Sequence, residues 1–330
     1  MKKRWMNYRA LDSFFRHFKI AWRHLTVKKL ANVAFVLPQY FLRRPKVFGR
    51  PFLLKVESSS FCNLKCDGCR SGKSNLKLDD GRMTIGLYKS ILDDIGDYIL
   101  EAALYVWGEP LSNKDICGMV ELSNQRNIGT VISTNMHFMT ESMARGLINA
   151  GLDKLIIAID GATSESYEKV RAGGDFNLVM RNLETFVRCK REMNSALPEI
   201  EWQYIRTDFN KGEMEEAQKT AARLGINYFN TIPDWSSREN SATTQKNRVK
   251  AYKAKRKICR WLWFAIAVQW NGDIYPCCHV ANNPARKFRN LKEIKISEIW
   301  NDSIYVNSRR KYALRNKLNK GEGTCFRCPV

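Results

Sequence analysis

Three cysteines lie close together near the start of the chain, at Cys62, Cys66 and Cys69. Three thiolates fall one short of the four ligands that a closed tetrahedral zinc site requires. They suit a four-iron cluster in which one iron keeps an open position, and chemistry would take place at that iron. Zinc is the alternative, since C-x2-C pairs also make structural zinc sites, but a zinc ribbon normally pairs one C-x2-C with a second.

The composition is that of a folded protein from a reducing compartment. The chain has 330 residues, of which 44% are hydrophobic, so it can bury a substantial core. Its ten cysteines do not indicate a disulfide scaffold, because such scaffolds belong to short secreted domains and the N-terminus lacks a signal peptide pattern. We expect a cytoplasmic protein whose cysteines bind metal.

Positive charge is concentrated in two segments of a chain with a net charge of +22. Residues 1–50 hold 13 Lys and Arg against the single acid Asp12, and residues 246–260 hold eight basic residues and no acid. Aromatic and leucine residues such as Trp22 interrupt the first segment, which is typical of helices at an anionic membrane surface. A peripheral anchor at the inner membrane surface is the favoured interpretation. A structural brace on the main domain and a nucleic-acid contact are the alternatives.

The longest apolar run, residues 30–42, contains Pro38 and is shorter than the roughly 20 residues needed to span a bilayer. We therefore expect no transmembrane helix there.

From Pro51 onward, short apolar strands alternate with amphipathic helices, which predicts parallel strands joined by crossover helices. The predicted strands are Phe52–Glu57, Ala103–Val106, Thr130–Thr134, Lys154–Asp160, Glu199–Ile205 and Asn227–Thr231. The predicted helices are Thr84–Ile95, Asp115–Arg126, Glu141–Ala150, Asn177–Glu192 and Glu213–Leu224. Gly129, Gly151 and Gly225 stand where helices are expected to end.

This pattern predicts an α/β fold, a partial (β/α)6 TIM-like barrel with ligand-binding loops at the C-terminal ends of its strands. We divide the chain into a basic helical extension (residues 1–50), the barrel (51–235), a basic linker (236–258) and a small C-terminal cluster-binding module (259–330). Several strand ends carry polar or glycine-rich residues, so their loops are expected to meet on one face.

The spacing C-x3-C-x2-C after the first strand resembles the signature of the radical S-adenosylmethionine (SAM) enzymes. The resemblance extends from Phe52 to about Thr231. It implies that Cys62, Cys66 and Cys69 bind a [4Fe-4S] cluster whose fourth iron is chelated by SAM. It also implies that one electron from this cluster cleaves SAM to a 5′-deoxyadenosyl radical, which takes a hydrogen atom from the substrate.

Further residues resemble the parts of that family that hold SAM. Trp107-Gly108-Glu109-Pro110 is similar to its glycine-glycine-glutamate-proline motif, with Trp107 in place of the first glycine. The SAM-binding residues implied by the resemblance are Gly108, Glu109, Pro110, Ser133, Thr134, Asn135 and Asp160. The chain departs from the family at Gly68 and Ala158, where many members have an aromatic residue and a serine. Capping of a strand end is the alternative role for residues 133–135.

A second group of cysteines lies near the C-terminus and resembles the auxiliary-cluster module called twitch or SPASM. The implied ligands of a second [4Fe-4S] cluster are Cys259, Cys277, Cys325 and Cys328. Asn271-Gly272-Asp273 is a hairpin turn signal that would fold Trp270 and Tyr275 back as paired strands. Zinc is the rival for this site.

Three other cysteines stand outside these two groups. Cys278 is a spare thiol, a substitute ligand or a hydrogen-atom donor to a substrate radical. Cys117 and Cys189 fall within predicted helices and are expected in the core.

The implied partners are a reductant such as a flavodoxin or ferredoxin and a small-molecule substrate: a sugar, a cyclitol or a lipid-linked compound. The auxiliary cluster would assist dehydrogenation, epimerisation or bond formation. The alternatives are a peptide- or protein-modifying maturase, an RNA-modifying radical enzyme, and a nonenzymatic iron–sulfur electron carrier. The carrier is disfavoured because its clusters would each have four protein ligands. Nucleic acid is disfavoured because no RNA-binding module is recognisable. Arg171, Gln203 and Arg206 follow predicted strands but are not assigned a catalytic role.

Overall fold

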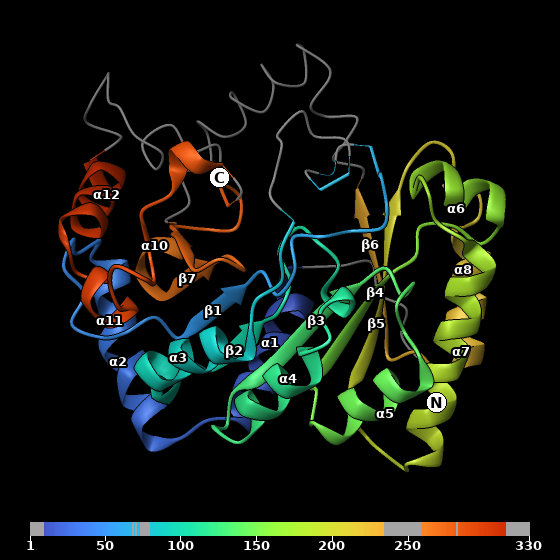
Figure 1. The fold of residues 1–330 in the computed structure, drawn as a ribbon, viewed down its shortest axis with the longest axis horizontal. Helices are drawn as coiled ribbons and strands as arrows, with labels where there is room; N and C mark the ends of the chain where they lie inside the picture. The colour runs from blue at the N-terminus through green and yellow to red at the C-terminus, as the bar shows by residue number, and fades with distance from the viewer. Residues whose placement is uncertain are drawn as a thin grey trace.

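The computed structural model of the protein shows an α/β fold with one mixed sheet and a helical N-terminal segment (Figure 1). The structure describes residues 10–67, 69, 71–72, 80–233, 259–281 and 283–314. Among the sequence predictions, the linker 236–258 and the two cysteines Cys325 and Cys328 lie outside the described residues.

The strands in chain order are β1 (Leu53–Val56), β2 (Glu101–Ala103), β3 (Gly129–Thr134), β4 (Lys154–Ala158), β5 (Glu199–Arg206), β6 (Tyr228–Pro233), β7 (Ala265–Val268), β8 (Asp273–Tyr275) and β9 (Arg289–Asn290). The α-helices are α1 (Ala10–Arg23), α2 (Val27–Phe41), α3 (Ile85–Ile95), α4 (Ile116–Asn124), α5 (Glu141–Asn149), α6 (Ser164–Val170), α7 (Phe176–Glu192), α8 (Met214–Leu224), α10 (Trp261–Phe264), α11 (Ile296–Ile299) and α12 (Ser303–Leu314). Three 3-10 helices are η1 (Gly96–Tyr98), η2 (Pro110–Ser112) and η3 (Pro284–Arg286).

The nine strands form one sheet in the order β6-β5-β4-β3-β2-β1-β7-β8-β9. Strands β1 to β6 are parallel neighbours in sequence order, as the alternation of strands and helices predicts. Strand β7 is also parallel to β1, with Leu54 opposite Ile266, so the C-terminal segment extends the sheet beyond β1. In Figure 1, α3, α4 and α5 lie in front of the strands and α1 lies behind them.

Local sequence signals set most helix starts. The side chains of Thr84, Thr140, Thr163 and Asp175 accept hydrogen bonds from the backbone three residues on, at the starts of α3, α5, α6 and α7. Predicted bounds agree with the structure to within about two residues, except for the second strand. That strand is β2, Glu101–Ala103, which lies earlier than the predicted Ala103–Val106. Helix α6 is an element that the sequence patterns did not indicate.

The two faces of the strands differ in character because side chains alternate along a strand. Leu155 and Ile157 of β4 and Trp202 of β5 belong to the large core under the helices. Val131 of β3 and Ile156 of β4 form a small second cluster on the inner face of the partial barrel, together with Ile20 of α1.

Glycine at position 129 is required by the close approach of α1. A Cβ atom there would lie 2.2 Å from Cγ2 of Ile20. The prediction that Gly129 ends a helix is wrong, because it is the first residue of β3 and Asn127 takes the left-handed conformation at φ 54° instead. At Gly151 and Gly225 the prediction is correct, since these glycines have φ of 82° and 77°.

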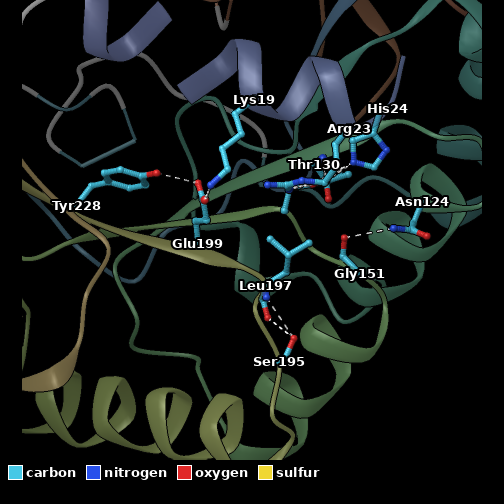
Figure 2. A network of polar contacts seen from close by, with 11 residues as sticks. Lys19, Arg23, His24, Asn124, Thr130, Gly151, Ser195, Leu197, Glu199 and Tyr228 are labelled. Atoms are coloured by element: carbon cyan, nitrogen blue, oxygen red, sulfur yellow. Dashed lines mark hydrogen bonds and ion pairs between the residues drawn. The ribbon is translucent and has the colours of Figure 1, made fainter. Parts of the chain in front are cut away.

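Helix α1 is attached by ion pairs to acidic residues at the N-terminal ends of the strands (Figure 2). Arg23 Nη1 and His24 Nε2 bind the buried carboxylate of Asp153 at 2.6 and 2.9 Å. The same carboxylate accepts a hydrogen bond from the backbone N–H of Thr130 at 2.9 Å. Lys19 binds Glu199 at the start of β5, as Figure 2 shows. His17 binds Glu101 at the start of β2 in the same way, at 2.7 Å.

These contacts favour the brace interpretation for the basic residues of α1. Lys19 and Arg23, which the sequence pattern assigned to a membrane surface, form ion pairs with carboxylates of the barrel. None of the helices in the described part of the chain combines the length and apolar character needed to cross a bilayer.

Changing Asp153 to alanine is expected to detach α1 from the barrel. The variant leaves Arg23, His24 and the Thr130 N–H without their shared acceptor, so we expect a loss of at least about 2 kcal/mol in the free energy of unfolding. Urea denaturation measures the loss, and limited proteolysis reports release of residues 10–23. Glu165→Ala removes an exposed pair to Lys169 and should cost less than about 0.5 kcal/mol. Equal stability of the two variants would contradict the brace.

The C-terminal hairpin forms as the turn signal predicts, although Trp270 lies beyond the end of β7. Strands β7 and β8 are antiparallel, and Gly272 has φ of 87° in the turn. Tyr275 is opposite Ala267 and not opposite Trp270. The ring of Trp270 instead covers Gly81, where a Cβ atom would lie 2.2 Å from it.

Candidate functional site

The three clustered cysteines lie in the loop that follows β1, and all are half-buried and outside any disulfide. Burial raises the pKa of Cys62 to about 12, and the charges of Glu109 and the other two cysteines act in the same direction. Burial also raises the pKa of Cys66. Thiols that raise one another's pKa are close in space, and a bound metal deprotonates them outright. The donor set therefore fits a metal cluster.

Backbone contacts attach the cysteine loop to two neighbouring segments. The N–H of Glu109 donates to the carbonyl of Phe61 at 2.7 Å, which joins the loop after β2. The N–H of Lys65 donates to the carbonyl of Ala172 at 2.8 Å, which joins the segment after α6. The cysteines are thus positioned by residues more than 40 positions away in sequence.

Gly108 allows the loop after β2 to approach the end of β1. A Cβ atom at this position would lie 2.1 Å from the carbonyl oxygen of Ser59, so a side chain cannot be accommodated without moving the backbone. Pro110 then begins η2. The predicted motif 107–110 therefore lies directly beside the cysteine loop.

The Glu109 carboxylate is buried and joins two strand ends. It accepts hydrogen bonds from Thr134 Oγ1 at 2.6 Å, from the Asn135 N–H at 2.8 Å and from the Leu111 N–H at 3.0 Å. Burial raises its pKa, and these bonds oppose the shift. A carboxylate accepts about four hydrogen bonds, so Glu109 retains capacity for one more donor. An ammonium group there would offset the cost of burying the charge, so the site fits the amino group of SAM.

Asn135 connects the end of β3 to the cysteine loop. Its side-chain amide lies 3.7 Å from Cys62 Sγ and donates to Asn63 Oδ1 at 3.0 Å. Thr134 and Asn135 thus do more than cap their own strand, because both contact the neighbouring motifs. Ser133 is partly exposed on the opposite face of β3 from Thr134.

Asp160, which follows β4, is fully buried and has both carboxylate oxygens engaged by protein donors. Arg171 Nε lies 2.6 Å from Oδ2, and the Ile205 N–H donates to Oδ1 at 2.6 Å. Arg171 also hydrogen-bonds the Cys66 thiol. Burial lowers the pKa of Arg171, but the charges of Asp160 and Cys66 raise it overall. Asp160 therefore acts on this site through Arg171, a guanidinium placed to stabilise a thiolate at Cys66.

Tyr167 of α6 is a residue of this site that sequence patterns did not reveal. Its side chain is fully buried, and its hydroxyl finds no hydrogen-bond partner among the residues that the structure describes. Burial raises its pKa, and the charges of Arg171, Asp160 and Cys66 all act on the hydroxyl, which is therefore close to the cysteine loop. Such an orphaned donor beside a candidate metal site fits a bound ligand atom.

We expect Tyr167→Phe to separate ligand binding from folding. The hydroxyl has no partner in the described protein, so its removal should leave the free energy of unfolding of the metal-free protein unchanged or slightly higher. A hydrogen bond lost to bound SAM or to the cluster should weaken SAM binding by about two- to tenfold. Thermal unfolding and equilibrium binding to reconstituted protein measure the two effects.

Tyr204→Phe is the matched control for this prediction. The Tyr204 hydroxyl is also buried but donates to the Asn210 carbonyl at 2.7 Å, so its loss should cost about 1 kcal/mol and leave SAM affinity unchanged. If Tyr167→Phe loses stability and keeps its SAM affinity, the hydroxyl has a purely structural role.

The C-terminal cysteines are described only in part. Cys259 is half-buried just before α10, Cys277 is buried after β8, and Cys278 is half-buried beside it. The two other predicted ligands, Cys325 and Cys328, lie outside the described residues. The four-cysteine site is therefore still a prediction.

Two cysteines outside the cysteine groups, and the strand residues Gln203 and Arg206, are placed as follows. Cys189 is fully buried in the core, and Cys117 is partly buried with its thiol 3.6 Å from Met143 Sδ. Gln203 is half-buried on the inner face of β5, and Arg206 is exposed at the end of that strand. Within the described ranges, the structure gives none of these four residues a contact with the cysteine loop.

Comparison with known proteins decides the family. The family model described as the radical SAM superfamily matches residues 56–196, and an iron-sulfur cluster-binding domain of the SPASM type matches residues 259–329. The chain carries a radical SAM domain with a C-terminal SPASM module. These two domains imply SAM and [4Fe-4S] clusters as cofactors.

The relatives of this chain are named for different functions. It is 26% identical over 171 residues to the AdoMet-dependent heme synthase of Methanosarcina barkeri, covering 52% of this chain and 46% of that protein. It is 27% identical over 175 residues to the mycofactocin maturase of Mycolicibacterium smegmatis, covering 53% and 43%. The chain thus spans about half the length of the curated relatives it matches.

The fold is shared with a solved radical SAM structure. The Streptococcus suis protein SuiB, in complex with SAM, matches with a TM-score of 0.63 and 17% identity, over 80% of this chain and 68% of SuiB. This likeness agrees with the predicted α/β partial barrel.

Proposed function

We propose that this chain catalyses a SAM-dependent radical reaction at the C-terminal edge of β1 to β4. The observation that supports it most is the Glu109 carboxylate, which joins the loop after β2 to the end of β3 beside Cys62. When bound, the reduced cluster and SAM supply a 5′-deoxyadenosyl radical that takes a hydrogen atom from the substrate. Cys62, Cys66 and Cys69 would hold the cluster, and Glu109 would orient the SAM amino group.

The other residues of the proposed site position these groups. Gly108 leaves the backbone free to approach, and Asn135 fixes the cysteine loop through Asn63. Arg171 offsets negative charge at Cys66. The auxiliary cluster would be held by Cys259, Cys277, Cys325 and Cys328. Ser133 and Pro110 are further proposed SAM-binding residues, and Cys278 is a proposed hydrogen-atom donor.

We further propose that the substrate is a peptide or protein side chain. The sugar, cyclitol or lipid-linked substrate expected from the sequence has no support among the relatives considered. A mycofactocin maturase is among those relatives, and SuiB, which shares the fold, has been solved bound to its precursor peptide SuiA. A small organic substrate is the second candidate, because the heme synthase matches an equally long part of the chain.

The reaction also needs an electron donor. A chain with net charge +22 attracts acidic proteins, which suits a flavodoxin or ferredoxin in a reducing compartment.

The test is reductive SAM cleavage by the anaerobically reconstituted full chain, followed by mass spectrometry of 5′-deoxyadenosine. We expect slow cleavage without substrate and faster cleavage with the right one. Deuterium from a labelled peptide should appear in the deoxyadenosine. Deuterium transfer from a labelled small molecule and from no peptide would favour the second candidate. No cleavage under any reductant would overturn the enzyme proposal.

A further inference from the structure

Helix α2 presents an unusual face to solvent. Large hydrophobic side chains that are exposed concentrate on it and on the residues beside it: eight of the ten in the described residues lie between positions 18 and 48. We call the α2 surface the set Trp22, Leu30, Phe35, Phe41, Leu42 and Phe48. Trp22 and Phe35 are 67% and 65% exposed, and Phe48 is 85% exposed.

Two polar residues of α2, Lys29 and Asn32, lie on its buried side, whereas Lys28 is exposed and pairs with Asp97. Lys29 is 1% exposed, and its ammonium group donates to the backbone carbonyls of Arg126 and Asn127. Asn32 is buried as well: its amide donates to the Arg50 carbonyl at 3.1 Å and its oxygen accepts from the Arg50 N–H at 2.8 Å. The helix therefore satisfies these two polar side chains inside the protein.

The outward side of α2 is largely apolar, with Lys28 as an exposed charge near its start. Val27, Leu30, Ala34 and Phe41 recur at spacings of three, four and seven, which places them on one face of a helix. Phe48 joins this face, because its N–H donates to the Gln39 side chain at 2.8 Å. On α1, Phe18 stacks on Trp22 with ring centroids 6.0 Å apart. A helix whose exposed face is largely apolar normally packs that face against a further apolar environment.

Basic residues adjoin this apolar face. Residues 43–50 contain Arg43, Arg44, Lys46 and Arg50 and no acid, and Arg44 and Lys46 are exposed. Exposed aromatic rings with a basic rim match the interface of an anionic bilayer, where rings enter the headgroup region and each Lys or Arg adds attraction. A second copy of the chain is the poorer match, because it would bring the same positive charge to the contact.

We propose that the α2 surface docks this protein peripherally on an anionic lipid bilayer. Trp22, Phe35 and Phe41 enter the interface, while Arg44 and Lys46 contact the headgroups. The ion pairs of Lys19 and Arg23 with the barrel then hold the docked helices to the rest of the enzyme.

The location of the α2 surface sets the orientation of the docked protein. Lys29 binds carbonyls that precede β3, Asn32 binds Arg50, which precedes β1, and Lys28 binds Asp97, which precedes β2. All three contacts are at the N-terminal ends of parallel strands, whereas Cys62, Cys66 and Cys69 follow the C-terminal end of β1. The docked enzyme therefore turns its reactive end away from the bilayer, toward a substrate in solution and not toward one embedded in lipid.

The experiment is cosedimentation of the full chain with vesicles of phosphatidylcholine alone or with phosphatidylglycerol. We expect binding to the anionic vesicles, and Phe35→Ser with Phe41→Ser should lower the partition coefficient by more than about tenfold. Phe209→Ser is the matched control, because Phe209 is 64% exposed on the loop between β5 and α8. Arg44→Gln with Lys46→Gln should weaken binding to anionic vesicles, and Lys169→Gln with Lys219→Gln should do so less.

Fluorescence gives a readout that does not depend on the serine variants. Brominated lipids in anionic vesicles should quench the tryptophan emission of the wild-type chain, and Trp22→Phe should remove that quenching. Failure of the wild-type chain to bind anionic vesicles would overturn the proposal, as would equal binding by Phe35→Ser with Phe41→Ser. A wild-type dimer in light scattering that this double variant converts to monomer would assign the surface to self-association and also overturn it.

Discussion

Changing Cys62, Cys66 and Cys69 together to alanine is expected to abolish reductive cleavage of SAM, by more than about a thousandfold. Bound iron should fall from about eight to about four per chain, because only the auxiliary cluster would remain. The physical reason is the donor set after β1: three half-buried cysteines whose thiols become thiolates on metal binding, with burial raising the pKa of Cys62 and Cys66 in the metal-free protein. Anaerobic iron and sulfide analysis and deoxyadenosine formation measure the two losses.

Cys117→Ala provides the control for this triple variant. Cys117 is a partly buried thiol on α4 that contacts Met143, so its removal should leave iron content and SAM cleavage unchanged. Stoichiometric zinc in place of iron in the wild-type protein would contradict the prediction. So would retention of SAM cleavage by the triple variant.

Changing Lys154 to methionine is expected to destabilise the barrel by about 3 to 5 kcal/mol. Lys154 Nζ lies 2.5 Å from Glu201 Oε2, and the two side chains are 4% and 3% exposed. Asn230 donates to the other carboxylate oxygen at 2.8 Å, so the group links β4, β5 and β6. Without Lys154, Glu201 keeps a buried charge that the neutral amide of Asn230 does not balance. Urea denaturation of the metal-free protein measures the loss.

The double variant Lys154→Met with Glu201→Leu should recover most of this stability. It removes both charges, and replacing a whole buried pair by apolar residues is often neutral. Asn230 keeps an amide to satisfy, so the recovery should stop short of the wild-type value. If Lys154→Met costs less than about 1 kcal/mol, or the double variant is worse than the single one, the pair does not stabilise the barrel as described.

Much of the site was predictable because its signals are local. The three cysteines fall within eight residues, and the alternation of apolar strands with amphipathic helices orders the parallel strands. Because parallel strands end at a common edge, the cysteine loop, Glu109 and Asn135 were expected to meet, and hydrogen bonds join them. The hairpin turn at Gly272 was predictable too, since glycine adopts its positive φ without steric cost.

What the sequence did not reveal depends on contacts between distant segments. Arg171 lies against Asp160 and Cys66, and Tyr167 lies near them, only because α6 folds back over the cysteine loop. No spacing in the chain encodes the parallel pairing of β1 with β7, which are about 210 residues apart.

The N-terminal helices show the same division. Composition alone determined that residues 1–50 are basic and rich in aromatic residues. Only the tertiary structure decided which of these side chains bind the barrel and which face outward, because an ion pair needs an acid from elsewhere in the chain. Asp153 and Glu199 bind the charges of α1, Gly129 makes room for Ile20, and Phe35 and Phe41 of α2 are left exposed.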